Sequence, residues 1–111
     1  MTKESFIIDG LGGKYSLAGE IKVGGAKNAA LKVMASSILF EDGVKLSNVP
    51  EIEDVYRMNE LLEDMGAKVK KETPHRYSID ASSLKHTDLE YQLSKRMRAS
   101  VVLTGPLLAK Y

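Results

Sequence analysis

Apolar and polar positions in the middle of the chain follow the spacing of two amphipathic helices. In the first, apolar residues recur every three or four positions, which predicts a helix over residues 27–40. The second is expected to begin near Ile52 and to end at Gly66, a residue suited to a left-handed helix cap. The apolar positions are Ala30, Leu31, Met34, Ala35, Ile38 and Leu39 in the first helix, and Val55, Met58, Leu61, Leu62 and Met65 in the second.

Strands are expected between and after these helices. Val44 and Leu46 alternate with polar residues, which predicts a short strand between the two helices. Residues 69–71 and 77–81 predict two further strands, joined by a hairpin turn at 73–76.

The two ends of the chain complete the pattern. Residues 1–24 predict an N-terminal β-hairpin, with strands at 6–9 and 16–23 on either side of a glycine-containing turn. A last helix is expected to start within residues 91–95 and to bend or break at Gly105-Pro106. The order ββ, then α-β-α-β-β, then α, is typical of an α/β fold.

Composition narrows the class of protein. The chain has 111 residues, which suits one domain, and its 16 Lys and Arg against 15 Asp and Glu argue against a nucleic-acid-binding protein. Cysteine is absent, and His75 and His86 lack metal-ligand spacing, so we interpret both as surface-loop histidines and expect no metal site. Neither a membrane-spanning apolar run nor a signal sequence is visible, and we expect a cytoplasmic protein.

Basic residues stand at the start of two of the expected helices. Gly24-Gly25 and Ala26 come just before Lys27, although the positive end of a helix disfavours cations. Arg98 stands with two more basic residues near the start of the last helix. Glycines let a backbone approach an anion closely, Asn28 is a hydrogen-bonding side chain, and Arg98 offers a planar fork to a phosphate or carboxylate. The alternative is a pair of solvated charges, since the penalty at an exposed helix end is only about 0.3–1 kcal/mol. Two such helix starts together favour a shared anionic ligand.

Several motifs, taken in order, carry a family resemblance. The run Gly-Gly-Ala-Lys-Asn-Ala-Ala-Leu at 24–31 resembles the N-terminal signature of the UDP-N-acetylglucosamine 1-carboxyvinyltransferase family, the enolpyruvyl transferases of peptidoglycan synthesis. The further matches are Asn48-Val49-Pro50, Asp54-Val55, residues 62–69, and Met97-Arg98-Ala99-Ser100 with Gly105-Pro106-Leu107. The resemblance spans nearly the whole chain.

The resemblance implies an activity and a set of binding residues. Members of this family transfer the enolpyruvyl group of phosphoenolpyruvate to the 3-hydroxyl of UDP-N-acetylglucosamine and release phosphate, without a metal, and we expect no cofactor. Lys27 and Asn28 match the family's phosphoenolpyruvate contacts, and Arg98 matches an arginine that contacts the nucleotide sugar. Asp54 matches a recurring acid, for which a favourable first-turn acid is as good an explanation as a substrate contact.

The resemblance also implies a domain organisation. The family fold has two domains, each an inside-out α/β barrel built from repeated β-α-β-α-β-β units. Residues 1–24 would then form a hairpin that belongs to the other domain, and residues 25–111 would form the first repeat unit and the start of the next. The family's catalytic cysteine would lie beyond residue 111, so we expect no catalytic residue in this chain and no activity of the chain alone.

The C-terminal pattern stops abruptly at apolar residues. Leu103, Leu107 and Leu108 are followed by no cap or polar tail, which indicates the first part of a longer protein. With part of the Met58–Leu62 face, they are expected to leave an apolar surface that leads either to self-association or to a disordered C-terminal segment.

Two alternative functions stay open. The enolpyruvyl transferase of the shikimate pathway has a similar pattern, but it usually carries lysine-serine where this chain has Lys27-Asn28. A non-catalytic module that binds an anion or a nucleotide sugar would keep the binding residues without the chemistry.

Overall fold

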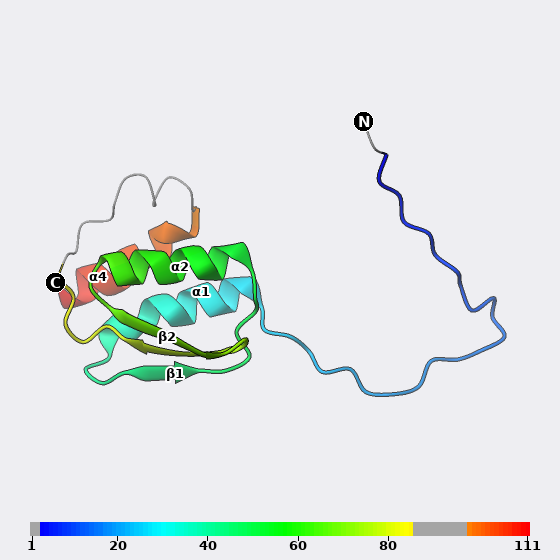
Figure 1. Ribbon diagram of the computed structural model, residues 1–111, viewed down its shortest axis with the longest axis horizontal. Coiled ribbons are helices and arrows are strands. Elements are labelled where there is room, and N and C mark those ends of the chain that lie inside the picture. The colour runs from blue at the N-terminus through cyan, green and yellow to red at the C-terminus, as the bar shows by residue number, and fades with distance from the viewer. Residues whose placement is uncertain (1–2, 86–97) are drawn as a thin grey trace.

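A three-stranded antiparallel sheet is covered on one face by helices (Figure 1). The computed structural model describes residues 3–85 and 98–111. In chain order the elements are α1 (Lys27–Ser36), the 3-10 turn η1 (Ser37–Leu39), β1 (Val44–Leu46), α2 (Glu53–Asp64), β2 (Lys68–Thr73), β3 (Arg76–Asp80), the 3-10 helix η2 (Arg98–Leu103) and α4 (Thr104–Lys110). The strand order is β1-β3-β2, so β3 is central.

The two helices predicted from apolar spacing are present. α2 carries Glu53 and Asp54 in its first turn, where carboxylates interact favourably with the helix dipole. Gly66 follows α2 with a φ of 103°, which confirms the predicted left-handed cap. The first helix is α-helical only as far as Ser36, whereas the prediction extended it to residue 40. The 3-10 turn η1, which is wound more tightly, continues it to Leu39.

The predicted strands are also present, and their register explains the core. In the β2–β3 hairpin Val69 pairs with Ile79 and Lys71 with Tyr77, and on the other side of β3 Val44 of β1 also pairs with Ile79. Alternation along β3 sends Tyr77 and Ile79 toward the helices, and both are buried.

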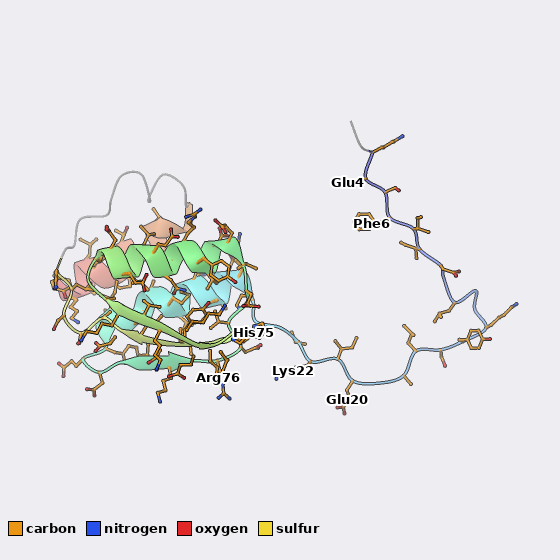
Figure 2. The ribbon with its side chains drawn as sticks, in the orientation of Figure 1. Glu4, Phe6, Glu20, Lys22, His75 and Arg76 are labelled. Carbon is orange, nitrogen blue, oxygen red and sulfur yellow. The ribbon has the colours of Figure 1, made fainter. Side chains whose placement is uncertain are left out.

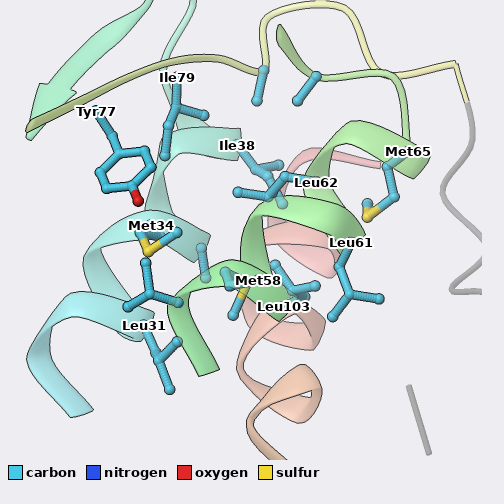
Figure 3. Close-up of a cluster of buried hydrophobic side chains, with 14 of the residues drawn as sticks. Leu31, Met34, Ile38, Met58, Leu61, Leu62, Met65, Tyr77, Ile79 and Leu103 are labelled. Carbon is cyan, nitrogen blue, oxygen red and sulfur yellow. The ribbon is translucent and has the colours of Figure 1, made fainter. Parts of the chain in front are cut away.

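One hydrophobic core joins the helices to the inner face of the sheet (Figure 3). α1 and α2 pack against each other, and η2 packs against both. The largest fully buried apolar side chains are Met34, Ile38, Met58, Leu61, Leu62, Met65, Tyr77, Ile79 and Leu103. Burial of a side chain of this size contributes about 1.5–3 kcal/mol, so this layer holds the start of α1 in a fixed place.

The predicted N-terminal hairpin does not form within this chain, and its place in a second domain stays a prediction. Residues 3–24 form no strand and extend away from the folded body (Figure 1). Phe6, Ile7 and Ile21 are 99%, 95% and 92% exposed. An isolated two-stranded hairpin is marginal in water and needs a surface to pack on, and the exposure of these side chains shows that the segment has none here.

The apolar surface predicted near the C-terminus is largely covered. Leu103 and the Met58–Leu62 face are buried, and Leu107 packs against the core, whereas Leu108 is 78% exposed. The correction arises because η2 folds back onto α1 and α2. Self-association of the chain through this surface stays a prediction, and Leu108 is the residue of the predicted surface that the structure leaves exposed.

The predicted interruption at Gly105-Pro106 takes the form of a change in helix type. η2 ends at Leu103 and α4 begins at Thr104, so Pro106 lies in the first turn of α4, where its missing N–H removes no helical hydrogen bond. The helix start predicted within residues 91–95 lies outside the described residues. Every helix in the part that the structure describes is too short or too polar to cross a bilayer.

Candidate functional site

The first turn of α1 has neither an acidic residue nor a capping side chain. Its N-cap is Ala26, whose side chain cannot accept a hydrogen bond, and the Ala26 carbonyl accepts the first helical hydrogen bond from Ala30 N–H at 2.9 Å. The first N–H groups of a helix have no partner within the helix, and they carry partial positive charge. Lys27 and Asn28 add a cation and an amide to this end of α1.

Two of the predicted site residues meet across the α1–α2 interface. Lys27 Nζ lies 2.8 Å from Asp54 Oδ2, and the two side chains are 56% and 36% exposed. Asp54 therefore supplies a negative charge that offsets part of the unfavourable position of Lys27. The pair is open to solvent, so the ammonium is still accessible to an anion that arrives from outside.

The other two predicted site residues are Asn28 and Arg98, and the structure describes the surroundings of Asn28 only. Asn28 is exposed next to Lys27 on the first turn of α1. Arg98 is the first residue of η2, which packs against α1. Its side chain is not among the described ones, so its contact with a nucleotide sugar stays a prediction. The other basic residues at that predicted helix start, Lys95 and Arg96, lie outside the described residues.

A close backbone contact fixes the entry into α1. A Cβ on Gly25 would overlap the Asn48 carbonyl oxygen and would lie 3.0 Å from Pro50 Cδ. Asn48 itself has a φ of 57°, an uncommon left-handed value that asparagine tolerates. Gly25 was predicted to allow approach to an anion, whereas here it allows approach to residue 48 of the same chain.

Open hollows border this contact, and Gly25 and Asn48 line both of the following two. One of about 260 Å³ is lined by Gly25, Ala26, Ala29 and Ala30 together with residues 46–49. The other, of about 450 Å³, is bordered by residues 22–25 and by His75, among others. Lys27, Asn28 and Asp54 line neither hollow, so the predicted binding residues form an exposed surface rather than a closed pocket.

A second ion pair holds the segment that follows Asn48. Lys71 Nζ of β2 donates to Glu51 Oε1 at 2.7 Å, and the ammonium lies 5.4 Å from the centre of the Tyr56 ring. The hydrogen bond lowers the pKa of Glu51 and raises the pKa of Lys71. Both groups therefore stay charged around neutral pH.

The chemistry of this surface is electrostatic. It offers a solvent-accessible ammonium, an amide and the positive end of a helix, all suited to a phosphate or carboxylate. Among the described residues, no group of three or more His, Asp and Glu side chains could hold a metal ion.

The fold matches that of a solved protein structure. The enolpyruvyl transferase NikO from Streptomyces tendae superposes with a TM-score of 0.72 over 85% of this chain and 22% of that chain, at 22% identity. This likeness confirms the predicted α/β fold class, part of an inside-out α/β barrel.

The sequence comparison gives the family. The sequence model of the EPSP synthase (3-phosphoshikimate 1-carboxyvinyltransferase) family matches residues 12–111. The chain therefore belongs to this family of enolpyruvyl transferases. Three relatives are each named UDP-N-acetylglucosamine 1-carboxyvinyltransferase. The protein from Desulfatibacillum aliphaticivorans is 48% identical over 88% of this chain, that from Pseudoalteromonas atlantica 44% over 86%, and that from Helicobacter pylori strain J99 39% over 89%. The chain covers 23%, 23% and 24% of their respective lengths, so it spans about a quarter of each relative.

Proposed function

We propose that this chain is the N-terminal part of a transferase that moves the enolpyruvyl group of phosphoenolpyruvate to the 3-hydroxyl of UDP-N-acetylglucosamine and releases phosphate. The observation that carries the proposal is the uncapped start of α1, where Lys27 is held in the open by Asp54. The relatives named UDP-N-acetylglucosamine 1-carboxyvinyltransferase, at 39–48% identity, support the proposal. The reaction would belong to peptidoglycan synthesis in the cytoplasm.

Each binding residue has a role in this proposal. Lys27 and Asn28 bind the phosphate and carboxylate groups of phosphoenolpyruvate, and the ammonium stabilises the negative charge of the tetrahedral intermediate. Arg98 binds the nucleotide sugar. Asp54 acts on the substrate through Lys27, because its carboxylate contacts that ammonium at 2.8 Å.

We also propose how this chain fits into a two-domain parent protein. Residues 1–24 form strands only against the second domain, which would explain why Phe6, Ile7 and Ile21 are uncovered in this chain. Residues 25–111 are the first repeat unit and the beginning of the next. The second domain would close the exposed surface around Lys27 and exclude water from it.

Substrate dependence in the full-length protein tests the proposed reaction. Phosphate release from phosphoenolpyruvate should require UDP-N-acetylglucosamine and should not occur with shikimate 3-phosphate in its place. The reverse preference would establish the shikimate-pathway alternative. Asn28 argues against that alternative, because the shikimate-pathway enzyme usually has serine at this position. Binding of both substrates without any turnover would favour the non-catalytic module.

The 111-residue chain alone should have no enolpyruvyl transfer activity. It contains no cysteine that could protonate the enolpyruvyl carbon, and it spans about a quarter of its relatives. The measurement is phosphate release with both substrates present, compared with a buffer control. Turnover by the chain above that control would contradict the prediction.

Replacing Asp54 with asparagine should tighten the binding of inorganic phosphate to the chain by about two- to fivefold at low salt. The substitution removes a negative charge 2.8 Å from the Lys27 ammonium, and an exposed pair of this kind is worth about 0–1 kcal/mol. A titration followed through the Lys27 and Asn28 amide signals measures the affinity. Glu53→Gln, which removes a charge from the same turn, is the matched control. Weaker binding by Asp54→Asn than by the control would contradict this role.

A further inference from the structure

We propose that His75, at the turn between β2 and β3, is a positioning residue that fixes the Lys27 end of α1 through the backbone of residues 48–49. The structural part of this inference stands by itself. Its consequence for substrate binding rests on the proposed function. His75 and Arg76 lie at the end of the sheet where the N-terminal segment, including Lys22, joins the folded body (Figure 2).

The first link is a reciprocal pair of hydrogen bonds between His75 and Val49. Val49 N–H donates to the His75 carbonyl oxygen at 3.1 Å, and His75 Nδ1 lies 2.9 Å from the Val49 carbonyl oxygen. A carbonyl oxygen only accepts, so Nδ1 must carry the proton. This requirement fixes the Nδ1–H tautomer whenever the ring is neutral. The Val49 side chain is buried, which anchors the other side of the pair.

The second link runs from Val49 to the entry of α1. The preceding residue, Asn48, is held in the left-handed region, and its carbonyl oxygen fills the space where a side chain on Gly25 would begin. Its side-chain Nδ2 lies 3.5 Å from the Val23 carbonyl oxygen. Asn48 therefore contacts the chain on both sides of Gly24, and α1 begins at Lys27 shortly afterwards.

The third link is the support that the left-handed conformation of Asn48 needs. A residue with positive φ persists only where its surroundings hold it, and residues 48–51 are tied to the β2–β3 hairpin at two points. These are the His75–Val49 pair and the Lys71–Glu51 ion pair. The hairpin is thus linked through Asn48 to the turn that carries Lys27. This link gives an exposed histidine a defined effect on a residue far from it in the sequence.

Three variants of the 111-residue chain separate this role from a general effect of the turn. His75→Leu removes the side-chain donor, and His75→Asn places an amide N–H where Nδ1 was. Arg76→Gln changes the adjacent exposed residue and is the control. Loss of one hydrogen bond is expected to make amide exchange of Val49 roughly two- to tenfold faster in His75→Leu. The Gly25 and Lys27 amide signals should shift in His75→Leu, return toward wild type in His75→Asn, and stay unchanged in Arg76→Gln.

Clear outcomes would overturn the inference. One is a His75→Leu chain whose Gly25 and Lys27 signals match those of Arg76→Gln. If His75→Leu does not fold, the nitrogen shifts of His75 in the wild-type chain decide, because a neutral ring protonated on Nε2 could not make the bond to Val49. A phosphoenolpyruvate titration followed at Lys27 is a separate measurement. No response in the wild-type chain would count against the proposed function, while the backbone signals would still test the role of His75.

Discussion

Replacing Lys27 with alanine in the full-length protein should lower kcat/KM by two to three orders of magnitude while leaving the fold intact. A positioned cation acts where negative charge develops in the transition state, and removal of one such group typically costs about 10²–10³ in rate. The fold should tolerate the change because an exposed ion pair is worth about 0–1 kcal/mol and alanine is the better helix former. The side chains of Lys27 and Asp54 are 56% and 36% exposed.

A second lysine on the same helix provides the control for this experiment. Lys32 is exposed on α1, so Lys32→Ala removes the same charge from the same element at a greater distance from the helix start. Steady-state kinetics with both substrates, alongside urea denaturation, should show a large loss only for Lys27→Ala. Retention of most of the activity by Lys27→Ala would show that the ammonium serves the helix and Asp54 rather than the substrate.

The elements that the sequence predicted well are those whose partners are close along the chain. The apolar positions of α1 and α2 repeat at helical spacing, and most of the predicted residues are buried, including Met34 and Leu62, whereas Leu39 is 50% exposed. The β2–β3 hairpin closes through a short turn, so its register depends on local residues. Residues 3–24 form no strand in this chain, because alternating apolar residues form a stable strand only where another surface covers their apolar side.

In the candidate site, too, features set by neighbouring residues were predictable, and contacts between distant segments were not. The place of Lys27 at a helix start was predictable, because a glycine pair before it and helical apolar spacing after it are local properties of the sequence, whereas its contact with a substrate stays a prediction. Asp54 was expected at a favourable helix position, and its contact with Lys27 depends on how α1 packs on α2. The His75–Val49 pair joins residues 26 positions apart, and a histidine in a polar turn carries no local signal of such a bond.

The contact between Gly25 and Asn48 leads to the second large effect. Gly25→Ala should destabilise the chain by about 1–3 kcal/mol, because overfilling a close contact forces the backbone to move. The new Cβ would overlap a backbone oxygen rather than the flexible end of a side chain, so relief requires movement of α1 or of residues 48–50. In the full-length protein such movement would also displace Lys27 and lower the rate.

Gly24→Ala is the matched control for this prediction, since a Cβ at residue 24 would meet no atom within 4 Å. Urea denaturation should place this control within about 0.5 kcal/mol of wild type, the range usual for a surface substitution. The backbone dihedral angles of Gly24 and Gly25 do not separate the two cases, because neither residue is among the glycines with positive φ. A Gly25→Ala chain as stable as Gly24→Ala would show that the entry to α1 yields easily. The uncapped helix start would then be held by the Lys27–Asp54 pair and the core alone, rather than by residue 48.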